Sequence, residues 1–190
     1  MSGLFTAAFL RRIGWDVDVF ERSPIELVGR GAGITTHPEL LEALEQSGAG
    51  TRDLGIEVPK RITIDREGRV IGERPLRQIL TSWDRLQRLL RETIDPAHYH
   101  LGHTFQHVEA ERRGVRVRFA EGRVEHADLL VGGDGIRSGV RAQLAPDVQP
   151  VYSGYYIWRG APNEADLSAR ALAEAAEPET TGEDAVAGLE

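Results

Sequence analysis

Hydrophobic residues recur at helical spacing in three parts of this chain of 190 residues. The first part spans 4–13 and the second spans 38–46, and a glycine comes soon after each, as glycines that end helices commonly do. The third part begins at 82–85 and carries leucines on one face as far as Ile94. The pattern therefore predicts three helices separated by other structure.

Alternation of polar and apolar residues marks strands in the remainder. It is regular over 16–20 and 115–119, which predicts strands with one buried face. Residues 58–73 and 115–127 each place a turn sequence between two apolar stretches, so they predict antiparallel hairpins. The run 129–131 is apolar throughout, which is typical of a short strand buried on both faces. Helices and strands in this order predict an α/β chain.

Three glycines and an aspartate follow the last of these strands. Gly132, Gly133 and Gly135 permit a tight turn and the close approach of a ligand to the main chain. Ser138 stands where a helix can begin, and Arg141 adds positive charge nearby. A strand, a glycine turn and a helix together can bind phosphate, because free N–H groups and the helix dipole point at the anion. A tight turn with a surface aspartate is the alternative interpretation.

The N-terminal residues have the order of the second half of a dinucleotide-binding βαβ unit. A predicted helix follows Gly3, a predicted strand follows that helix, and Glu21 stands at the end of the strand. In such units an acid about 20 residues after the glycine loop accepts hydrogen bonds from ribose hydroxyls. Glu21 is therefore a candidate ribose ligand, and a solvated acid at a strand end is the alternative.

Composition narrows the possible functions. A hydrophobic content of 41% is enough for an ordinary core, and a net charge of −7 argues against nucleic acid as a partner. The chain has no cysteine, which excludes disulfides, thiolate zinc sites and cysteine nucleophiles. No apolar run approaches the ~20 residues of a membrane helix, and no signal peptide is recognisable. We therefore expect a cytoplasmic protein with no membrane partner.

Four histidines, His98, His100, His103 and His107, lie close together in the sequence. His98 and His100 would share one face of a strand, but no carboxylate shares that face at useful spacing. We therefore predict no metal site and interpret the histidines as a polar strand face. Hydrolase motifs of the G-x-S-x-G and H-E-x-x-H types do not occur.

Five segments resemble the flavin-dependent aromatic hydroxylases, the p-hydroxybenzoate hydroxylase-like monooxygenases. Residues 133–141 resemble the family motif G-D-G-x-x-S-x-x-R, and residues 19–23 resemble its strand end V-x-E-[RK]-[SA]. Residues 30–34 resemble its R-G-A-G-I loop, and residues 82–90 resemble a helix whose arginine contacts FAD. Residues 152–160 resemble the aromatic strand that starts the substrate-binding sheet. The resemblance covers roughly 3–160 of this chain.

The resemblance implies an incomplete Rossmann-like FAD/NAD(P)-binding domain with an antiparallel β-meander. It places a partial FAD-binding domain at 1–150 and the start of a substrate-domain sheet at 151–162. The composition of 163–190, with little apolar content, indicates a polar tail rich in Ala and Glu that is either a solvated helix or disordered. Family members carry a first strand and glycine turn ahead of the position of Gly3, and further sequence after the aromatic strand. We therefore expect a chain truncated at both ends.

The resemblance also implies cofactor-binding roles for residues in these segments. These residues are Gly3, Glu21, Arg22, Arg30, Gly31, Gly33, Arg85, Gln87, Asp134, Gly135, Ser138 and Arg141. It implies FAD and NAD(P)H as cofactors and a small aromatic substrate. It assigns no catalytic acid or base.

Three functional hypotheses follow. The first is a fragment of an FAD-dependent, NAD(P)H-using monooxygenase that hydroxylates an aromatic or N-heteroaromatic ring. The second is a catalytically inactive nucleotide-binding remnant, or one piece of a split protein. The third, a simple NAD-dependent dehydrogenase, leaves the Gly-Asp-Gly segment and the aromatic strand unexplained.

Overall fold

The computed structural model describes residues 1–27, 33–155, 164–166 and 169. Arg30, Gly31, residues 156–160 of the predicted aromatic strand and nearly all of the predicted tail lie outside these residues. The chain forms two compact units. The first comprises Met1–Arg30, Glu39–Arg52 and Asp84–Tyr156, and the second comprises Gly31–Pro38, Asp53–Trp83 and Ile157–Glu190.

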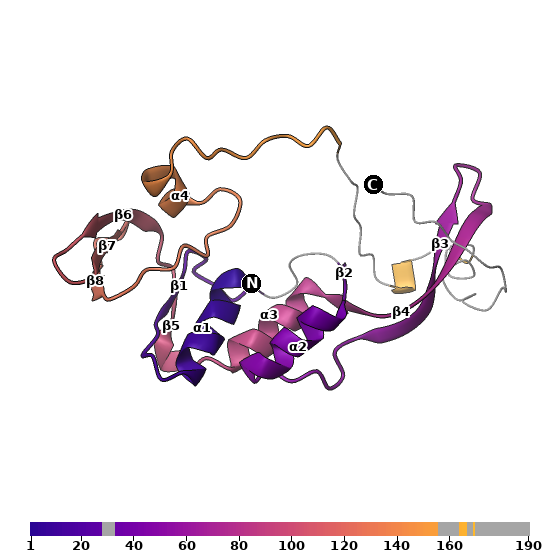
Figure 1. Ribbon diagram of the computed structural model, residues 1–190, viewed down its shortest axis with the longest axis horizontal. Coiled ribbons are helices and arrows are strands. Elements are labelled where there is room, and N and C mark those ends of the chain that lie inside the picture. The colour runs from indigo at the N-terminus through magenta and orange to yellow at the C-terminus, as the bar shows by residue number, and fades with distance from the viewer. Residues whose placement is uncertain (28–32, 156–163, 167–168, 170–190) are drawn as a thin grey trace. The chain divides into compact units, whose positions relative to one another are not determined.

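The first unit contains nearly all of the helical structure and two small sheets (Figure 1). Its helices are α1 (Ser2–Arg12), α2 (Pro38–Ser47), α3 (Trp83–Glu92) and α4 (Gly139–Leu144), and a 3-10 turn spans Pro96–His98. Its strands are β1 (Val19–Glu21), β5 (Tyr99–Leu101), β6 (Phe105–Ala110), β7 (Val115–Phe119) and β8 (Val124–Ala127). Strands β1 and β5 pair in parallel, whereas β6, β7 and β8 form an antiparallel meander.

The three helices predicted from hydrophobic spacing are confirmed as α1, α2 and α3, with small shifts at their ends. Gly14 and Gly48 follow α1 and α2 with φ values of 92° and 84°, a conformation that ends helices at low cost only for glycine. The predicted apolar face of α3 is buried, including Leu86 and Leu90. Burial of these leucines therefore fixes which side of the helix faces the interior.

The meander was also predicted, and it carries a buried cluster of Val108, Val117 and Phe119. Phe20 from β1 packs against this cluster, and its ring centroid lies 4.6 Å from that of Phe119. Leu130 packs against the same cluster. Aromatic and aliphatic packing therefore connects β1 to the meander and to the segment that leads into the glycine turn.

The prediction of a strand buried on both faces at 129–131 is wrong. None of the described strands pairs with this segment, and Leu129 and Val131 are 49% and 45% exposed. A strand is buried on both faces only when neighbours pair with its edges and layers cover its faces. Residues 151–155 of the predicted aromatic strand also form no strand, and Val151 is 89% exposed.

The second unit contains the three-stranded antiparallel sheet of β2 (Gly33–Thr35), β3 (Ile56–Ile64) and β4 (Val70–Ser82), in the order β2-β4-β3. The hairpin predicted at 58–73 is confirmed, and its second strand continues to Ser82. Asp65 N donates to Arg69 O at 2.9 Å across the turn. Gly33 lies opposite Ser82 at the end of the β2–β4 pairing.

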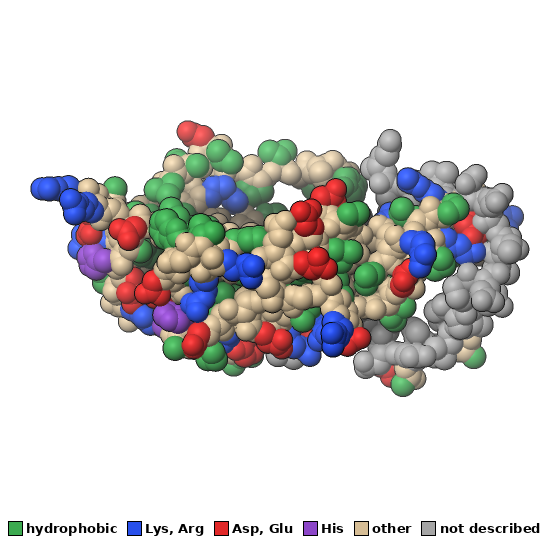
Figure 2. All heavy atoms as spheres, turned by 60° about the horizontal axis from the view of Figure 1, so that its bottom comes forward, with side chains coloured by type: hydrophobic (Ala, Val, Ile, Leu, Met, Phe, Trp, Pro, Cys, Tyr) green, Lys and Arg blue, Asp and Glu red, His purple; other side chains and the backbone are tan. Residues whose placement is uncertain are grey.

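The described surface mixes charges of both signs. On the face drawn in Figure 2, basic and acidic side chains are interspersed with hydrophobic ones, so this face presents no extended field of one sign. Among the described residues, no helix is both long enough and apolar enough to cross a membrane.

Candidate functional site

The first component of the site is the N-terminal end of α1. Met1 occupies the position before this helix of 11 residues, no side chain caps it, and its first turn contains no acid. The first N–H groups of a helix have no partner within the helix, and the helix dipole makes this end positive. The end of α1 therefore offers the donors and the charge that suit an anion such as a diphosphate.

Gly3, in the first turn of α1, lies against Gly133. A Cβ atom at position 133 would lie 2.8 Å from Gly3 Cα and 2.9 Å from Gly3 N, so position 133 requires glycine. A Cβ at position 3 would lie 3.8 Å from Gly133 Cα, which is ordinary van der Waals contact. The structure thus brings together two glycines that are separated by most of the chain.

Glu21 ends β1 near the same end of α1. Burial lowers the pKa of the Met1 amine, and the charge of Glu21 opposes this without reversing it. Glu21 Oε1 accepts a hydrogen bond of 2.9 Å from Ser23 N. Among the described residues nothing donates to Glu21 Oε2. One carboxylate oxygen therefore fixes the local turn, and the other can accept from a ligand hydroxyl.

Unlike Glu21, Asp134 accepts hydrogen bonds from the chain with both of its carboxylate oxygens. Its Oδ2 accepts from Gly139 N at 2.7 Å and Val140 N at 3.2 Å, and its Oδ1 accepts from Ser138 Oγ at 2.5 Å. Partial burial raises the pKa of Asp134, but these hydrogen bonds outweigh burial and hold the pKa below its ordinary value. The N-terminal N–H groups of α4 thus have their anion within the chain, namely Asp134.

Ser138 completes this anchor. Its side chain is buried, and its Oγ accepts from Arg141 N at 2.9 Å as the cap of α4. The Arg141 guanidinium donates back to Ile136 O. Gly135 turns the chain with φ of 78°, and a Cβ there would meet no atom within 4 Å. Ser138 and Arg141 therefore stabilise the glycine segment from within.

The other predicted cofactor residues lie in varied surroundings. Arg22 is exposed directly after Glu21, and Gly33 belongs to the second unit. Arg85 Nη2 lies 3.5 Å from Arg52 O, and Gln87 is only 5% exposed. The described structure brings Gly3, Glu21 and the 133–141 segment together around one end of α1. For all of the predicted residues, contact with a cofactor stays a prediction.

Sequence reasoning missed a group of side chains around Tyr99, namely Gln87, Arg91, Glu21 and Glu26. Tyr99 is 8% exposed, and the Arg91 guanidinium carbon lies 4.0 Å from its ring centroid. Burial raises the pKa of Tyr99, and the charges of Glu21 and Glu26 raise it further. Arg91 follows Gln87 by one helical turn, and this spacing was the available signal.

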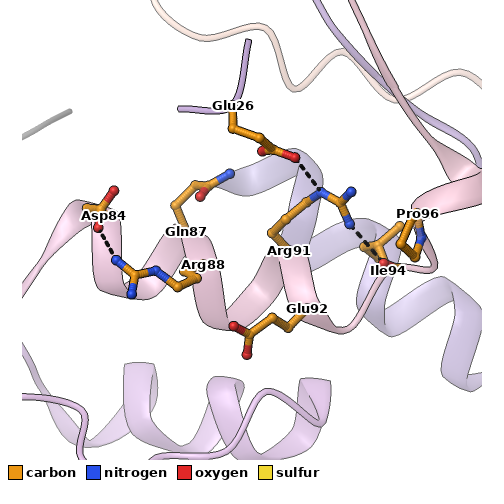
Figure 3. Close-up of a pocket in the computed structure, with 8 residues that line it drawn as sticks. All are labelled: Glu26, Asp84, Gln87, Arg88, Arg91, Glu92, Ile94 and Pro96. Atoms are coloured by element: carbon orange, nitrogen blue, oxygen red, sulfur yellow. Dashed lines mark hydrogen bonds and ion pairs between the residues drawn. The ribbon is translucent and has the colours of Figure 1, made fainter. Parts of the chain in front are cut away.

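Arg91, Gln87 and Glu26 border a hollow of about 430 Å³ in the first unit (Figure 3). Its lining residues are Glu26, Asp84, Gln87, Arg88, Arg91, Glu92, Ile94 and Pro96. The Gln87 amide favours the ionised form of the Tyr99 phenol, but its Nε2 reaches no acceptor at hydrogen-bond geometry within the described part of the chain. The wall of this hollow therefore contains a buried donor that has no acceptor among the described residues.

A carboxylate from another part of the chain lies beside two of the four histidines, although none shares their strand face at useful spacing in the sequence. Asp18 Oδ1 lies 3.1 Å from His98 Nδ1 and 2.8 Å from His100 Nε2. Asp18 directly precedes β1, and the parallel pairing of β1 with β5 places it beside both imidazoles. Burial raises the pKa of Asp18, but the two histidine contacts outweigh burial and lower it overall. Within the described ranges, no group of three such side chains is arranged to hold a metal ion.

A helix with uncapped N–H groups, an adjacent strand ending in an acid and a glycine contact at the helix start are features typical of dinucleotide-binding sites. The mixed α/β fold agrees with this class. The chain belongs to the FAD binding domain family, whose model matches residues 1–174.

Similar proteins are flavin monooxygenases. The 2,6-dihydroxypyridine 3-monooxygenase of Paenarthrobacter nicotinovorans is 35% identical over 161 residues, which cover 84% of this chain and 40% of that protein. The 3-amino-4-hydroxybenzoate 2-monooxygenase of Streptomyces cremeus is 34% identical over 175 residues, which cover 84% of this chain and 43% of that protein.

The fold agrees with a solved structure of the same type. The structure of 2,6-dihydroxypyridine-3-hydroxylase from Arthrobacter nicotinovorans matches with a TM-score of 0.72 and 34% identity. The match covers 80% of this chain and 39% of that one. The chain therefore spans less than half the length of these relatives.

Proposed function

We propose that this chain is the FAD-binding part of a monooxygenase that uses NAD(P)H to hydroxylate a small aromatic or N-heteroaromatic ring. The observation that carries the proposal is the meeting of Gly3, Glu21 and Gly133 at one end of α1. The names of the similar proteins support the reaction class and a heteroaromatic or aminohydroxybenzoate type of substrate.

The donor set at this end of α1 fits FAD. The uncapped N–H groups of α1 would hold the diphosphate, and Glu21 Oε2 would accept from a ribose hydroxyl. The contact between Gly3 and Gly133 would fix the helix start relative to the glycine segment, which Asp134 holds in place. When bound, FAD supplies the redox and oxygen chemistry, and the protein binds and orients it.

The other residues named from the resemblance extend this binding site in the proposal. They are Arg22, Arg30, Gly31, Gly33, Arg85, Gln87, Asp134, Gly135, Ser138 and Arg141. NAD(P)H is proposed as the reductant on the strength of the family resemblance.

Titration of the purified chain with FAD tests the proposal. We expect saturable quenching of flavin fluorescence, and weaker binding by Glu21→Gln than by the surface variant Glu57→Gln. Equal affinity of the two variants, or no binding by the unmodified chain, would overturn the proposed site. FAD binding without NAD(P)H oxidation would favour the alternative of an inactive nucleotide-binding piece.

A further inference from the structure

Arg91 lies where three parts of the first unit meet. Its Nη1 donates to Ile94 O at 2.9 Å, which ties the side chain to the end of α3. Its guanidinium lies over the ring of Tyr99 in β5, and its Nε faces Glu26 Oε1 at 3.8 Å. Figure 3 shows Arg91 extending from α3 toward both Glu26 and Ile94.

The segment between Glu21 and Glu26 is held at its first half by backbone contacts. Glu21 O accepts from His103 N at 2.9 Å, and Ser23 O accepts from Gly102 N at 2.9 Å. Both donors directly follow β5, so the strand pair fixes this half. At the far end, Glu26 faces Arg91.

Charges of both signs act on the Tyr99 phenol. Two carboxylates, Glu21 and Glu26, act on the same phenol, and Arg91 acts on it with the opposite sign. The Arg91 side chain is 16% exposed, and its Nε has no hydrogen-bond partner among the described residues. Because the guanidinium is poorly exposed to water, its charge is weakly screened, and it attracts the Glu26 carboxylate that faces it.

We infer that Arg91 is a positioning residue that holds the Glu21–Glu26 segment, and so the Glu21 carboxylate, at the nucleotide site. This inference rests on the proposed function for its ligand, FAD. It assigns Arg91 no contact with the cofactor, because its described contacts are with Tyr99, Glu26 and Ile94.

Arg88 provides a matched control one turn away. It lines the same hollow, but its side chain is 51% exposed and pairs with Asp84 on its own helix at 2.6 Å. Arg91→Gln and Arg88→Gln remove the same charge from the same helix. Only the former removes the ion pair with Glu26, at the far end of the segment that carries Glu21.

The first test is a double-mutant cycle on FAD affinity, measured by flavin fluorescence. We expect Arg91→Gln to weaken FAD binding about fivefold, and to have little effect once Glu21→Gln is present. Arg91→Lys, which retains the charge, should recover part of the loss. Equal losses with and without Glu21→Gln, or an equal loss in Arg88→Gln, would overturn the inference.

The second test needs no cofactor. The pKa of Tyr99 is read by ultraviolet titration as the difference from Tyr99→Phe, since the chain has four tyrosines. Loss of the Arg91 charge should raise this pKa further, whereas Arg88→Gln should leave it unchanged. An unchanged Tyr99 titration in Arg91→Gln overturns the inference. Failure of the unmodified chain to bind FAD would instead overturn the proposed function.

Discussion

Two acids, Glu21 and Asp134, were predicted to bind the cofactor, and the structure gives them different surroundings. Glu21 commits one carboxylate oxygen to Ser23 N, and no described residue donates to the other. Both oxygens of Asp134 accept hydrogen bonds from the start of α4. Both oxygens of Asp134 therefore hold the glycine segment in place, whereas Glu21 keeps one oxygen to which no described residue donates.

The largest effect on stability should come from adding a side chain at Gly133, next to Asp134, where the backbone contacts Gly3. Gly133→Ala places a Cβ against the backbone of Gly3 and should lower the free energy of unfolding by about 2 kcal/mol. Urea unfolding followed by circular dichroism measures this.

Gly3→Ala is the matched control for this contact. Its Cβ finds ordinary contact distances, and alanine favours a helix over glycine, so stability should hold or rise slightly. Equal destabilisation by both variants would show that the two backbones are not in close contact.

The second prediction separates the two acids by stability. Asp134→Ala leaves N–H groups of α4 without their acceptor and should cost about 1 kcal/mol in unfolding free energy. Glu21→Gln retains an oxygen for Ser23 N and should change the unfolding free energy little. If Glu21→Gln is as destabilising as Asp134→Ala, the contrast between the acids fails.

The third prediction separates them by ligand binding. Glu21→Gln should raise the dissociation constant for FAD about tenfold, because a charged acceptor for a ribose hydroxyl becomes neutral. Fluorescence titration measures this, with Glu57→Gln, which breaks an exposed ion pair with Arg77, as the control. Normal FAD affinity in Glu21→Gln would assign Glu21 to the fold instead.

The smallest effect is on how the unfolding free energy changes at acid pH. The folded-state pKa of Asp134 lies below its ordinary value of 3.8, so the ionised form is the one that the fold stabilises. The stabilisation by ionised Asp134 is fully present above the ordinary pKa of 3.8, and it is lost as pH falls through the lower pKa of the folded state. Asp134→Asn should therefore flatten the loss of stability below about pH 4, measured by urea unfolding at several pH values. An identical pH dependence in the two proteins would contradict this assignment.

The sequence alone predicted the helices, the hairpin at 58–73 and the β-meander. Each depends on hydrophobic spacing and turn residues within a few positions of one another, which are local properties of the chain. The same is true of Glu21 at the end of its strand. The resemblance in 133–141 pointed to the correct family before any contact was known.

Tertiary structure decided which of these residues meet and how each is used. The contact of Gly3 with Gly133 and the place of Asp18 between two histidines both join residues whose spacing in sequence carries no such signal. Tyr99 and Arg91 acquire their electrostatic surroundings in the same way. Burial of 129–131 on both faces would have required strand neighbours, which a hydrophobic run cannot supply by itself, and Leu129 and Val131 are exposed.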